Sequence, residues 1–223
     1  MRKYSSKYKE FIDLLNFSNG KYEKIDVFKD FVTIYAIAIK NKMYFKQEDE
    51  NIYFDIIKKY KKSELDIFPK LVNALIELYY RERDEIRDVL GEIYYEIGAI
   101  KGNRKQFFSP KEIGKLNSLL AVGKKITKKE FITIYDPTCG SGVLLLEAAN
   151  ELMRKKIDYT QKAFYWGQDV DFICFCMAYI QLSLYGMPAI IILGDTLTLQ
   201  EKKVFYTPEF FIGKWDEKLK NKK

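Results

Sequence analysis

The amino-acid sequence predicts an α/β fold: a parallel sheet, of which about three strands can be identified, preceded by an α-helical N-terminal region. Three observations support this class. After about residue 130, short apolar segments alternate with helical segments, an order typical of strands and their connecting helices. Those apolar segments are nearly continuous, which indicates strands buried on both faces of a parallel sheet. Before residue 100, apolar residues recur at helical spacing instead.

These patterns divide the chain into a helical region over residues 1–100, an α/β domain over residues 101–200 and a basic C-terminal tail over residues 201–223. The basic, glycine-containing segment Lys101-Gly-Asn-Arg-Lys105 is the expected boundary between the first two. Gly91 is the expected point at which the last N-terminal helix divides. The expected N-terminal helices are Tyr8 to Leu15, Val27 to Met43, Asn51 to Lys61 and Phe68 to Ile97.

Composition excludes several classes of chemistry. The chain of 223 residues contains no histidine, which rules out Ser-His-Asp catalysis and any histidine-ligated metal centre. Its three cysteines include no Cys-x-x-Cys pair, which argues against a disulfide framework or a zinc site. With no signal peptide and no long uncharged apolar span, we expect a cytoplasmic protein that makes no use of a membrane. The net charge of +7 permits a polyanionic partner without establishing one.

The central stretch of the α/β region is a strand, a glycine turn and a helix. A β-branched and aromatic strand from Phe131 ends at Asp136, and the turn to Gly142 precedes a helix expected from Val143 to Lys156. The turn lacks the Gly-Lys-Ser/Thr of a phosphate loop, and Leu145 stands where a dinucleotide motif has its third glycine. An acid beside such a turn suits a ligand with a cationic end, such as S-adenosylmethionine (SAM). The alternative is an ordinary turn whose glycines serve geometry alone.

Two further apolar strands also end at acids. Ala163 to Gln168 is followed by Asp169, and Ala189 to Leu193 is followed by Gly194 and Asp195. In open parallel sheets, ligands bind at the carboxyl ends of the strands, and an acid at the second strand is placed to accept hydrogen bonds from a ribose diol. Three acids on successive strands therefore predict a ligand crevice.

These residues carry a family resemblance. Asp136-Pro-Thr-Cys-Gly-Ser-Gly142 resembles the SAM-binding motif of adenine-N6 DNA methyltransferases, and is most similar to the methylation subunits of type I restriction–modification systems. Asp88-Val-Leu-Gly-Glu-Ile-Tyr94 resembles the segment that precedes the family's Gln-Phe-Phe-Thr-Pro motif, which here is Gln106-Phe-Phe-Ser-Pro110. Gly167-Gln-Asp169 and Gly194-Asp-Thr-Leu197 resemble two further motifs, in the family's order.

The resemblance implies a partial Rossmann-like SAM-dependent methyltransferase sheet with SAM as cofactor. It implies that Gln106 to Pro110 lie over the methionine end of SAM, that Asp169 holds the ribose, and that Asp195 accepts a hydrogen bond from the adenine amine. The candidate cofactor-binding residues are Gln106, Phe107, Phe108, Ser109, Pro110, Asp136, Pro137, Thr138, Cys139, Gly140, Gly142, Asp169 and Asp195.

One family motif is missing. The family carries catalysis in an Asn/Asp-Pro-Pro-Phe/Tyr motif, whose first residue accepts hydrogen bonds from the target amine and whose ring stacks on the flipped base. This sequence contains no Pro-Pro, and Tyr206-Thr-Pro208 has no Asn or Asp before its proline. We therefore assign no catalytic and no metal-binding residue. The expected function is a SAM-binding protein of the DNA adenine-N6 methyltransferase family that lacks independent catalysis.

Three alternatives remain open. The chain could be an active methyltransferase subunit that needs a partner, a non-enzymatic decoy or regulator of restriction–modification, or a fragment of a longer reading frame. The expected partners are DNA and a protein, namely another methyltransferase subunit, a specificity subunit or a second copy of the chain. The basic side chains before the first strand could neutralise phosphates or could be ordinary solvated loop residues. These side chains are Lys101, Arg104, Lys105, Lys124, Lys125, Lys128 and Lys129.

Overall fold

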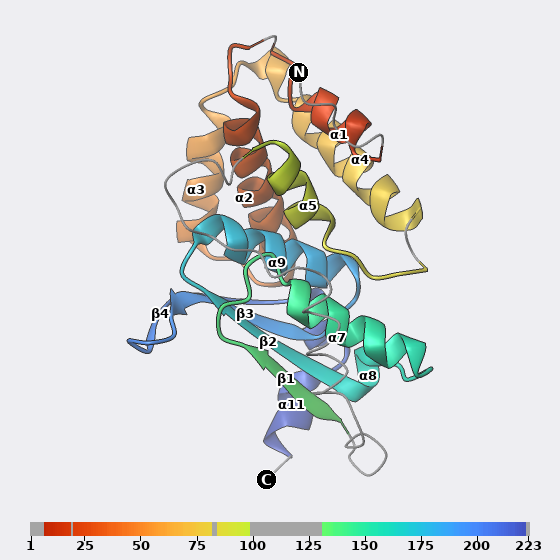
Figure 1. The fold of residues 1–223 in the computed structure, drawn as a ribbon. Helices are drawn as coiled ribbons and strands as arrows, with labels where there is room; N and C mark the ends of the chain where they lie inside the picture. The colour runs from red at the N-terminus through yellow and green to blue at the C-terminus, as the bar shows by residue number, and fades with distance from the viewer. Residues whose placement is uncertain (1–6, 19, 82–83, 99–130, 222–223) are drawn as a thin grey trace. The chain divides into compact units, whose positions relative to one another are not determined.

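The computed structural model describes residues 7–18, 20–81, 84–98 and 131–221. The chain forms two compact units, which Figure 1 shows as a ribbon. The helical unit comprises Met1–Arg83 and Val89–Phe107. The α/β unit comprises Asp84–Asp88 and Phe108–Lys223. The short segment Asp84–Asp88 therefore belongs to the second unit although the chain on both sides of it belongs to the first.

The helical unit is built from α-helices and one 3₁₀ helix, and its helices confirm the periodicity of the N-terminal sequence. They are α1 (Lys9–Leu14), α2 (Lys24–Met43), α3 (Gln47–Ile57), the 3₁₀ helix η1 (Lys62–Glu64), α4 (Ile67–Arg81) and α5 (Val89–Glu96). Within this unit α1 lies beside α4, and α2 lies beside α3 (Figure 1). No helix in the described ranges is long and apolar enough to cross a membrane.

Aromatic side chains fill the core of the helical unit. Phe11 of α1 meets Phe31 of α2 edge-on, with ring centroids 5.5 Å apart. Phe28 of α2 stacks on Tyr94 of α5 at 5.4 Å. The same unit also buries an ion pair between α2 and α3, in which Lys40 Nζ lies 2.6 Å from Asp49 Oδ2. Both of these charged side chains are almost completely buried, which makes the pair part of the core.

The α/β unit contains a four-stranded sheet in the order β1-β2-β3-β4. Its first three strands are parallel and run close to the predicted bounds. They are β1 (Ile132–Asp136), β2 (Ala163–Asp169) and β3 (Ala189–Asp195). The strands alternate with α7 (Val143–Arg154), the short α8 (Tyr159–Lys162) and α9 (Phe172–Leu184). The predicted α/β class, with about three parallel strands, is confirmed.

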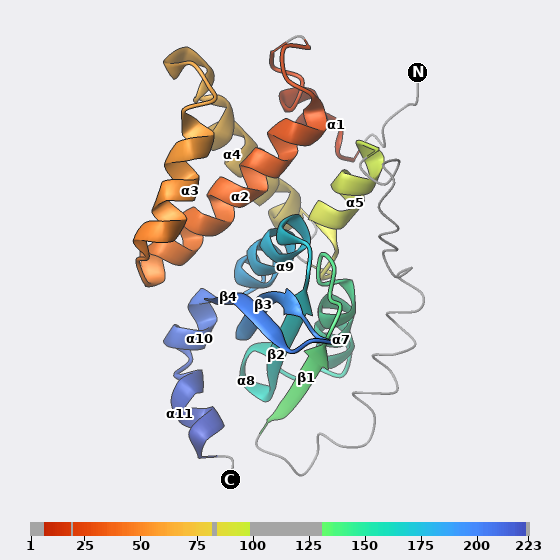
Figure 2. The same cartoon turned by 90° about the vertical axis from the view of Figure 1, so that its left-hand side faces the viewer.

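Helices cover both faces of this sheet. On one face, Phe175 and Tyr179 of α9 pack on Phe205, with ring centroids 4.7 and 5.1 Å apart. On the other face, Phe164 packs against Phe210 and Trp215 in a buried cluster. Figure 2 shows α7 and α9 on one side of the sheet and α10 (Pro208–Ile212) and α11 (Trp215–Lys220) on the other. Cover on both faces explains why β2 and β3 are largely apolar and buried, whereas Thr133 and Tyr135 of β1 are exposed.

Residues 201–223, which the sequence predicts as a basic tail, contain folded structure instead. The strand β4 (Gln200–Tyr206) pairs antiparallel with β3, and α10 and α11 follow it. The strand lies at the edge of the sheet, where the exposed side chains of Glu201 and Lys202 protect against pairing with other chains. The hairpin depends on Gly194, because a Cβ there would lie 2.1 Å from the carbonyl oxygen of Gln200.

The long helix expected over Phe68 to Ile97 divides, but not at Gly91. Instead α4 ends at Arg81, α5 begins at Val89, and Gly91 lies buried inside α5. The segment Asp84–Asp88 between them is held by side chains of the α/β unit, which a local pattern cannot reveal. The expected boundary at Lys101 to Lys105 lies outside the described residues, as do the lysines at positions 124, 125, 128 and 129.

Candidate functional site

The three acids predicted at strand ends are the last residues of three adjacent strands. Asp136 ends β1, Asp169 ends β2 and Asp195 ends β3. Because these strands are parallel and adjacent in the sheet, their carboxyl ends lie together at one end of the sheet. The structure thus brings the three predicted carboxylates to the same end of the sheet.

The glycine turn after β1 has a backbone that requires glycine. Gly140 and Gly142 have φ values of 56° and 100°, in the left-handed region that side chains with a Cβ rarely adopt. A Cβ on Gly142 would also lie 3.1 Å from Leu182 Cδ1 of α9. The turn closes with a hydrogen bond of 2.7 Å from Gly142 N to the Cys139 carbonyl, and α7 begins at the next residue.

Hydrogen bonds connect this turn to the other two strand ends. Gly140 N donates to Asp169 Oδ2 at 2.8 Å, and Cys139 N donates to the Gln168 carbonyl at 2.8 Å. From the end of β3, Thr196 Oγ1 donates to the Pro137 carbonyl at 2.6 Å. The loop from Pro137 to Gly142 is therefore held from the carboxyl ends of both β2 and β3, which fixes the positions of its backbone groups.

Asp136 is the most unusual of the three acids, because it is buried with half of its carboxylate unsatisfied. Oδ1 accepts a hydrogen bond from Thr138 N at 3.1 Å, while the buried Oδ2 has no hydrogen-bond partner among the described residues. Burial raises the pKa of Asp136, the nearby charge of Asp169 raises it further, and the Thr138 hydrogen bond opposes both. An unsatisfied buried carboxylate oxygen fits a ligand that brings a hydrogen-bond donor with positive charge.

The other two acids have more of their hydrogen bonds made. Asp169 accepts from Gly140 N with Oδ2 and from Asp171 N at 2.9 Å with Oδ1. Burial raises the pKa of Asp169, and these backbone hydrogen bonds lower it in part. Asp195 is half-exposed, and its Oδ1 accepts from Leu197 N at 2.9 Å. A carboxylate oxygen has two lone pairs, so both acids keep acceptor capacity for ligand hydroxyl or amine groups.

The three cysteines are free thiols buried in the α/β unit. Cys139 in the turn and Cys174 and Cys176 in α9 are all buried. Burial raises the pKa of Cys139 well above its ordinary value, and the charges of Asp169 and Asp136 raise it further. The thiol is therefore protonated at neutral pH and is a poor nucleophile. Within the described ranges, no cluster of acidic or cysteine side chains could hold a metal ion.

The candidate residues Gln106, Phe107, Phe108, Ser109 and Pro110 lie outside the described residues. Three residues outside the candidate cofactor-binding set also contact the site: Asp88, Ser141 and Gln181. Asp88 and Ser141 lie in two of the family-like segments, whereas no local signal marks Gln181. Asp88 Oδ2 accepts a hydrogen bond from Ser141 Oγ at 2.7 Å, and Gln181 Nε2 donates to Asp88 Oδ1 at 2.8 Å. These residues are 53 and 93 positions apart, and the pattern of a single sequence does not connect them.

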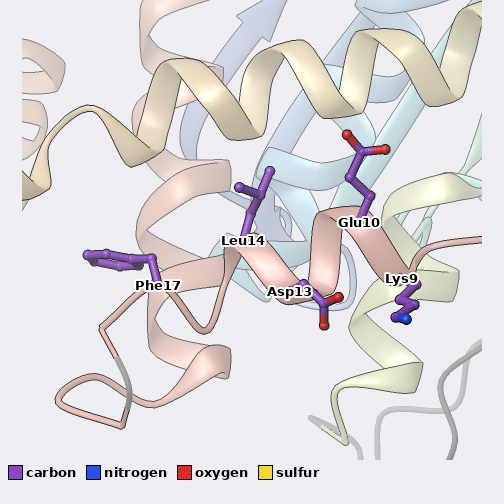
Figure 3. A pocket seen from close by; sticks show the side chains of 5 residues that line it. All are labelled: Lys9, Glu10, Asp13, Leu14 and Phe17. Atoms are coloured by element: carbon purple, nitrogen blue, oxygen red, sulfur yellow. The ribbon is translucent and has the colours of Figure 1, made fainter.

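Two cavities lined by described residues lie in the helical unit. A wide depression of about 600 Å³ runs along α1 and is lined by Lys9, Glu10, Asp13, Leu14 and Phe17 (Figure 3). A second cavity of about 370 Å³ includes Asp30, which is already bound by Lys59 and by Tyr60, each at 2.8 Å. The residues that line these cavities include no buried polar atom without a hydrogen-bond partner. Cavity volume alone therefore does not identify the functional site. The chemistry identifies the strand ends as the candidate site.

Sequence comparisons relate this chain to known proteins. The sequence profile described as "N-6 DNA Methylase" matches residues 85–221. The chain is similar to the type I restriction enzyme MpnII methylase subunit of Mycoplasma pneumoniae, with 31% identity over 150 residues, which are 61% of this chain and 26% of that protein. It is also similar to the MjaIX methylase subunit of Methanocaldococcus jannaschii, with 27% identity over 73% of this chain and 30% of that protein.

The matched part of these curated relatives is thus about a third of their length or less. The solved methyltransferase subunit of a type I restriction–modification system from Streptococcus thermophilus shares 21% identity. That alignment covers 86% of this chain and 52% of that chain, with a TM-score of 0.40. The family match spans more than half of the chain and indicates SAM as the cofactor. The chain therefore belongs to the N-6 DNA methylase family.

Proposed function

We propose that this chain is the SAM-binding part of a DNA adenine-N6 methyltransferase and that it does not methylate DNA alone. One observation carries the proposal. Three acids end adjacent parallel strands around a glycine turn, and the buried Oδ2 of Asp136 has no hydrogen-bond partner among the described residues. SAM has a cationic sulfonium and an ammonium group, the kind of donor end that such an oxygen would stabilise.

Each candidate residue has a role in this proposal. Asp136 accepts from the cationic end of SAM, with the backbone from Pro137 to Gly142 closing around it. Asp169 accepts from the ribose hydroxyls, for which both its oxygens keep a lone pair. Asp195 accepts from the adenine amine. The segment Gln106 to Pro110 covers the methionine end. When bound, SAM would supply the electrophilic methyl group.

The candidate residues account for SAM but not for the target adenine amine. Methyl transfer to adenine N6 needs an acceptor for the hydrogen bonds of that amine and a ring on which the flipped base stacks. The sequence contains no Asn/Asp-Pro-Pro-Phe/Tyr motif. We therefore propose that polypeptide outside residues 1–223 supplies these groups, and that DNA binds only to the assembled protein.

Calorimetric titration with SAM tests the cofactor part of the proposal. We expect binding by the purified chain, and Asp136→Ala should raise the Kd about 10- to 100-fold, since it removes a charge-assisted hydrogen bond. Asp55→Ala is the matched control, because Asp55 is an exposed acid on α3 and should leave the Kd unchanged. No heat at millimolar SAM would contradict SAM binding by this chain and would favour the non-enzymatic regulator.

Labelled SAM and adenine-containing DNA test the catalytic part. The chain alone should transfer no label to DNA. Addition of a polypeptide that carries the missing Asn/Asp-Pro-Pro-Phe/Tyr motif should produce labelled DNA, and Asp136→Ala should abolish that label. Label transferred by the chain alone, and lost in Asp136→Ala, would instead show an independent methyltransferase with an unrecognised amine acceptor.

A further inference from the structure

The segment Asp84–Asp88 is held in the α/β unit by side chains that take the place of a neighbouring strand. Asn150 of α7 bonds both backbone groups of Ile86, accepting from N at 2.9 Å and donating to O at 2.5 Å. The Tyr185 hydroxyl does the same for Arg87, accepting from N at 2.9 Å and donating to O at 3.2 Å. The backbones of two consecutive residues are thus fixed by the side chains of Asn150 and Tyr185. These hydrogen bonds bring the next residue, Asp88, to a defined position.

Asp88 contacts the glycine turn directly. Its Oδ2 accepts from Ser141 Oγ at 2.7 Å, and its Oδ1 accepts from Gln181 Nε2 at 2.8 Å. The same Gln181 nitrogen donates to the Ser141 carbonyl at 2.7 Å. Ser141 and Gln181 are both completely buried. The hydroxyl and the carbonyl of Ser141 are therefore fixed together, in a closed network of three residues.

Ser141 stands between the two glycines with positive φ. Because glycine populates many backbone conformations, a turn with Gly140 and Gly142 has little shape of its own. Gly140 is held on one side by Asp169, which lies at the end of β2. Ser141 is held by Asp88 and Gln181, neither of which belongs to the predicted cofactor-binding set. The shape of the turn thus depends on two independent anchors, one from β2 and one from Asp88 with α9.

We propose that Asp88 and Gln181 are positioning residues for the cofactor turn. They keep Gly140 to Gly142 in the one backbone shape that presents the turn to SAM, without contacting SAM themselves. The proposal rests on the proposed binding of SAM at this turn and deepens it. A merely structural network would stabilise the whole unit equally and would have no particular effect on the turn.

Two readouts separate these cases. The first is the Kd for SAM, measured by calorimetry. The second is the hydrogen-exchange rate of the Gly140 to Gly142 amides in the ligand-free protein, which does not depend on any ligand. Asp88→Asn keeps the shape of the side chain but places an amide where the carboxylate accepts two hydrogen bonds. Tyr185→Phe is the matched control, because it frees the same segment at Arg87 without touching the turn.

We expect Asp88→Asn to raise the Kd for SAM about tenfold and to speed exchange at the turn by a similar factor. Tyr185→Phe should leave both within about twofold, even where its melting temperature falls as far as that of Asp88→Asn. Should Asp88→Asn fail to fold, Ser141→Ala removes only the hydroxyl of the network and should move both readouts in the same direction.

The proposal is overturned if, in every variant, the Kd for SAM and the hydrogen-exchange rate at the turn change only in proportion to the fall in melting temperature. If the unchanged chain binds no SAM, the proposed function fails, and turn exchange in the ligand-free variants alone decides the positioning role. Faster exchange confined to the turn in Asp88→Asn then supports it, and uniform exchange across the unit refutes it.

Discussion

One buried aspartate in each unit, Asp49 in the helical unit and Asp136 in the α/β unit, is accommodated in an opposite way. In the helical unit, Asp49 is buried with Lys40 Nζ at 2.6 Å, so its charge has a direct counter-charge. In the α/β unit, Asp136 is buried beside a second acid, Asp169, and one of its oxygens has no hydrogen-bond partner among the described residues. The first arrangement is complete in the protein alone. In the proposed function, a ligand completes the second arrangement by donating a hydrogen bond to Asp136 Oδ2.

The largest expected effect comes from breaking the complete arrangement. Asp49→Ala leaves the Lys40 ammonium buried without its carboxylate, and should lower the free energy of unfolding by about 3–5 kcal/mol in a urea titration. The Kd for SAM should not change. The double variant Lys40→Met with Asp49→Leu should recover most of the loss, because an apolar pair of similar volume requires no desolvation of charge. A loss below about 1 kcal/mol in Asp49→Ala would contradict a stabilising role for the pair.

Removing the charge of Asp136 should stabilise the ligand-free protein, whereas removing that of Asp49 should destabilise it. Asp136→Asn removes a buried charge while retaining an acceptor for Thr138 N. The ligand-free protein should gain roughly 2–4 °C in melting temperature, the equivalent of about 1 kcal/mol in a chain of this size. Its Kd for SAM should rise about 10- to 100-fold. Asp55→Asn, on the exposed face of α3, should change neither quantity. A lower melting temperature with an unchanged Kd would show that Asp136 stabilises the fold and does not bind SAM.

The stability of the ligand-free protein and its affinity for SAM should also change in opposite directions with pH. The folded protein holds the pKa of Asp136 and Asp169 above their ordinary value of 3.8. Their contribution to stability is therefore fully present below about pH 3.8 and is lost as the pH rises through the raised values. In the proposed site, SAM binds to the ionised carboxylates, so its affinity should increase over the same pH range. Melting curves and calorimetry from pH 4 to 8 measure both, and parallel changes would contradict the prediction. In Asp136→Asn both dependences should be weaker.

The smallest effect is expected at Asp195, because this acid is half-exposed and water competes for its oxygens. Asp195→Asn should raise the Kd for SAM about two- to fivefold, the range of a single partly solvated hydrogen bond, and leave the melting temperature unchanged. Calorimetry at one pH suffices. An effect as large as that of Asp136→Asn would show that burial does not rank the three acids.

Much of the α/β unit could be predicted from sequence because its signals are local. Apolar runs that stop at Asp136, Asp169 and Asp195 place both the strands and the acids, since a parallel sheet brings carboxyl ends together. The strand β4 could not be predicted in this way. Glu201, Lys202 and Lys203 obscure its pattern, and its place at the edge of the sheet permits such charges.

Long-range contacts explain the other differences. The break between α4 and α5 lies at Asp84–Asp88 because Asn150 and Tyr185, 64 and 98 positions from their partners, bond that segment. Gly91 was the better local signal for a break, yet it is buried within α5. The contact of Asp88 with Ser141 is hidden for the same reason. Hydrogen bonds between distant side chains leave no periodicity in a single sequence.

The placement of the cysteines gives the protein a built-in chemical reporter. Cys139, Cys174 and Cys176 are buried in the α/β unit, and the sequence before Cys139 contains no other cysteine. Modification by a thiol reagent therefore reports on opening of the α/β unit, which holds all three thiols. Labelling rates would measure the opening free energy of one unit in the intact chain. Because Cys139 lies within the turn itself, SAM should slow its labelling more than that of Cys176.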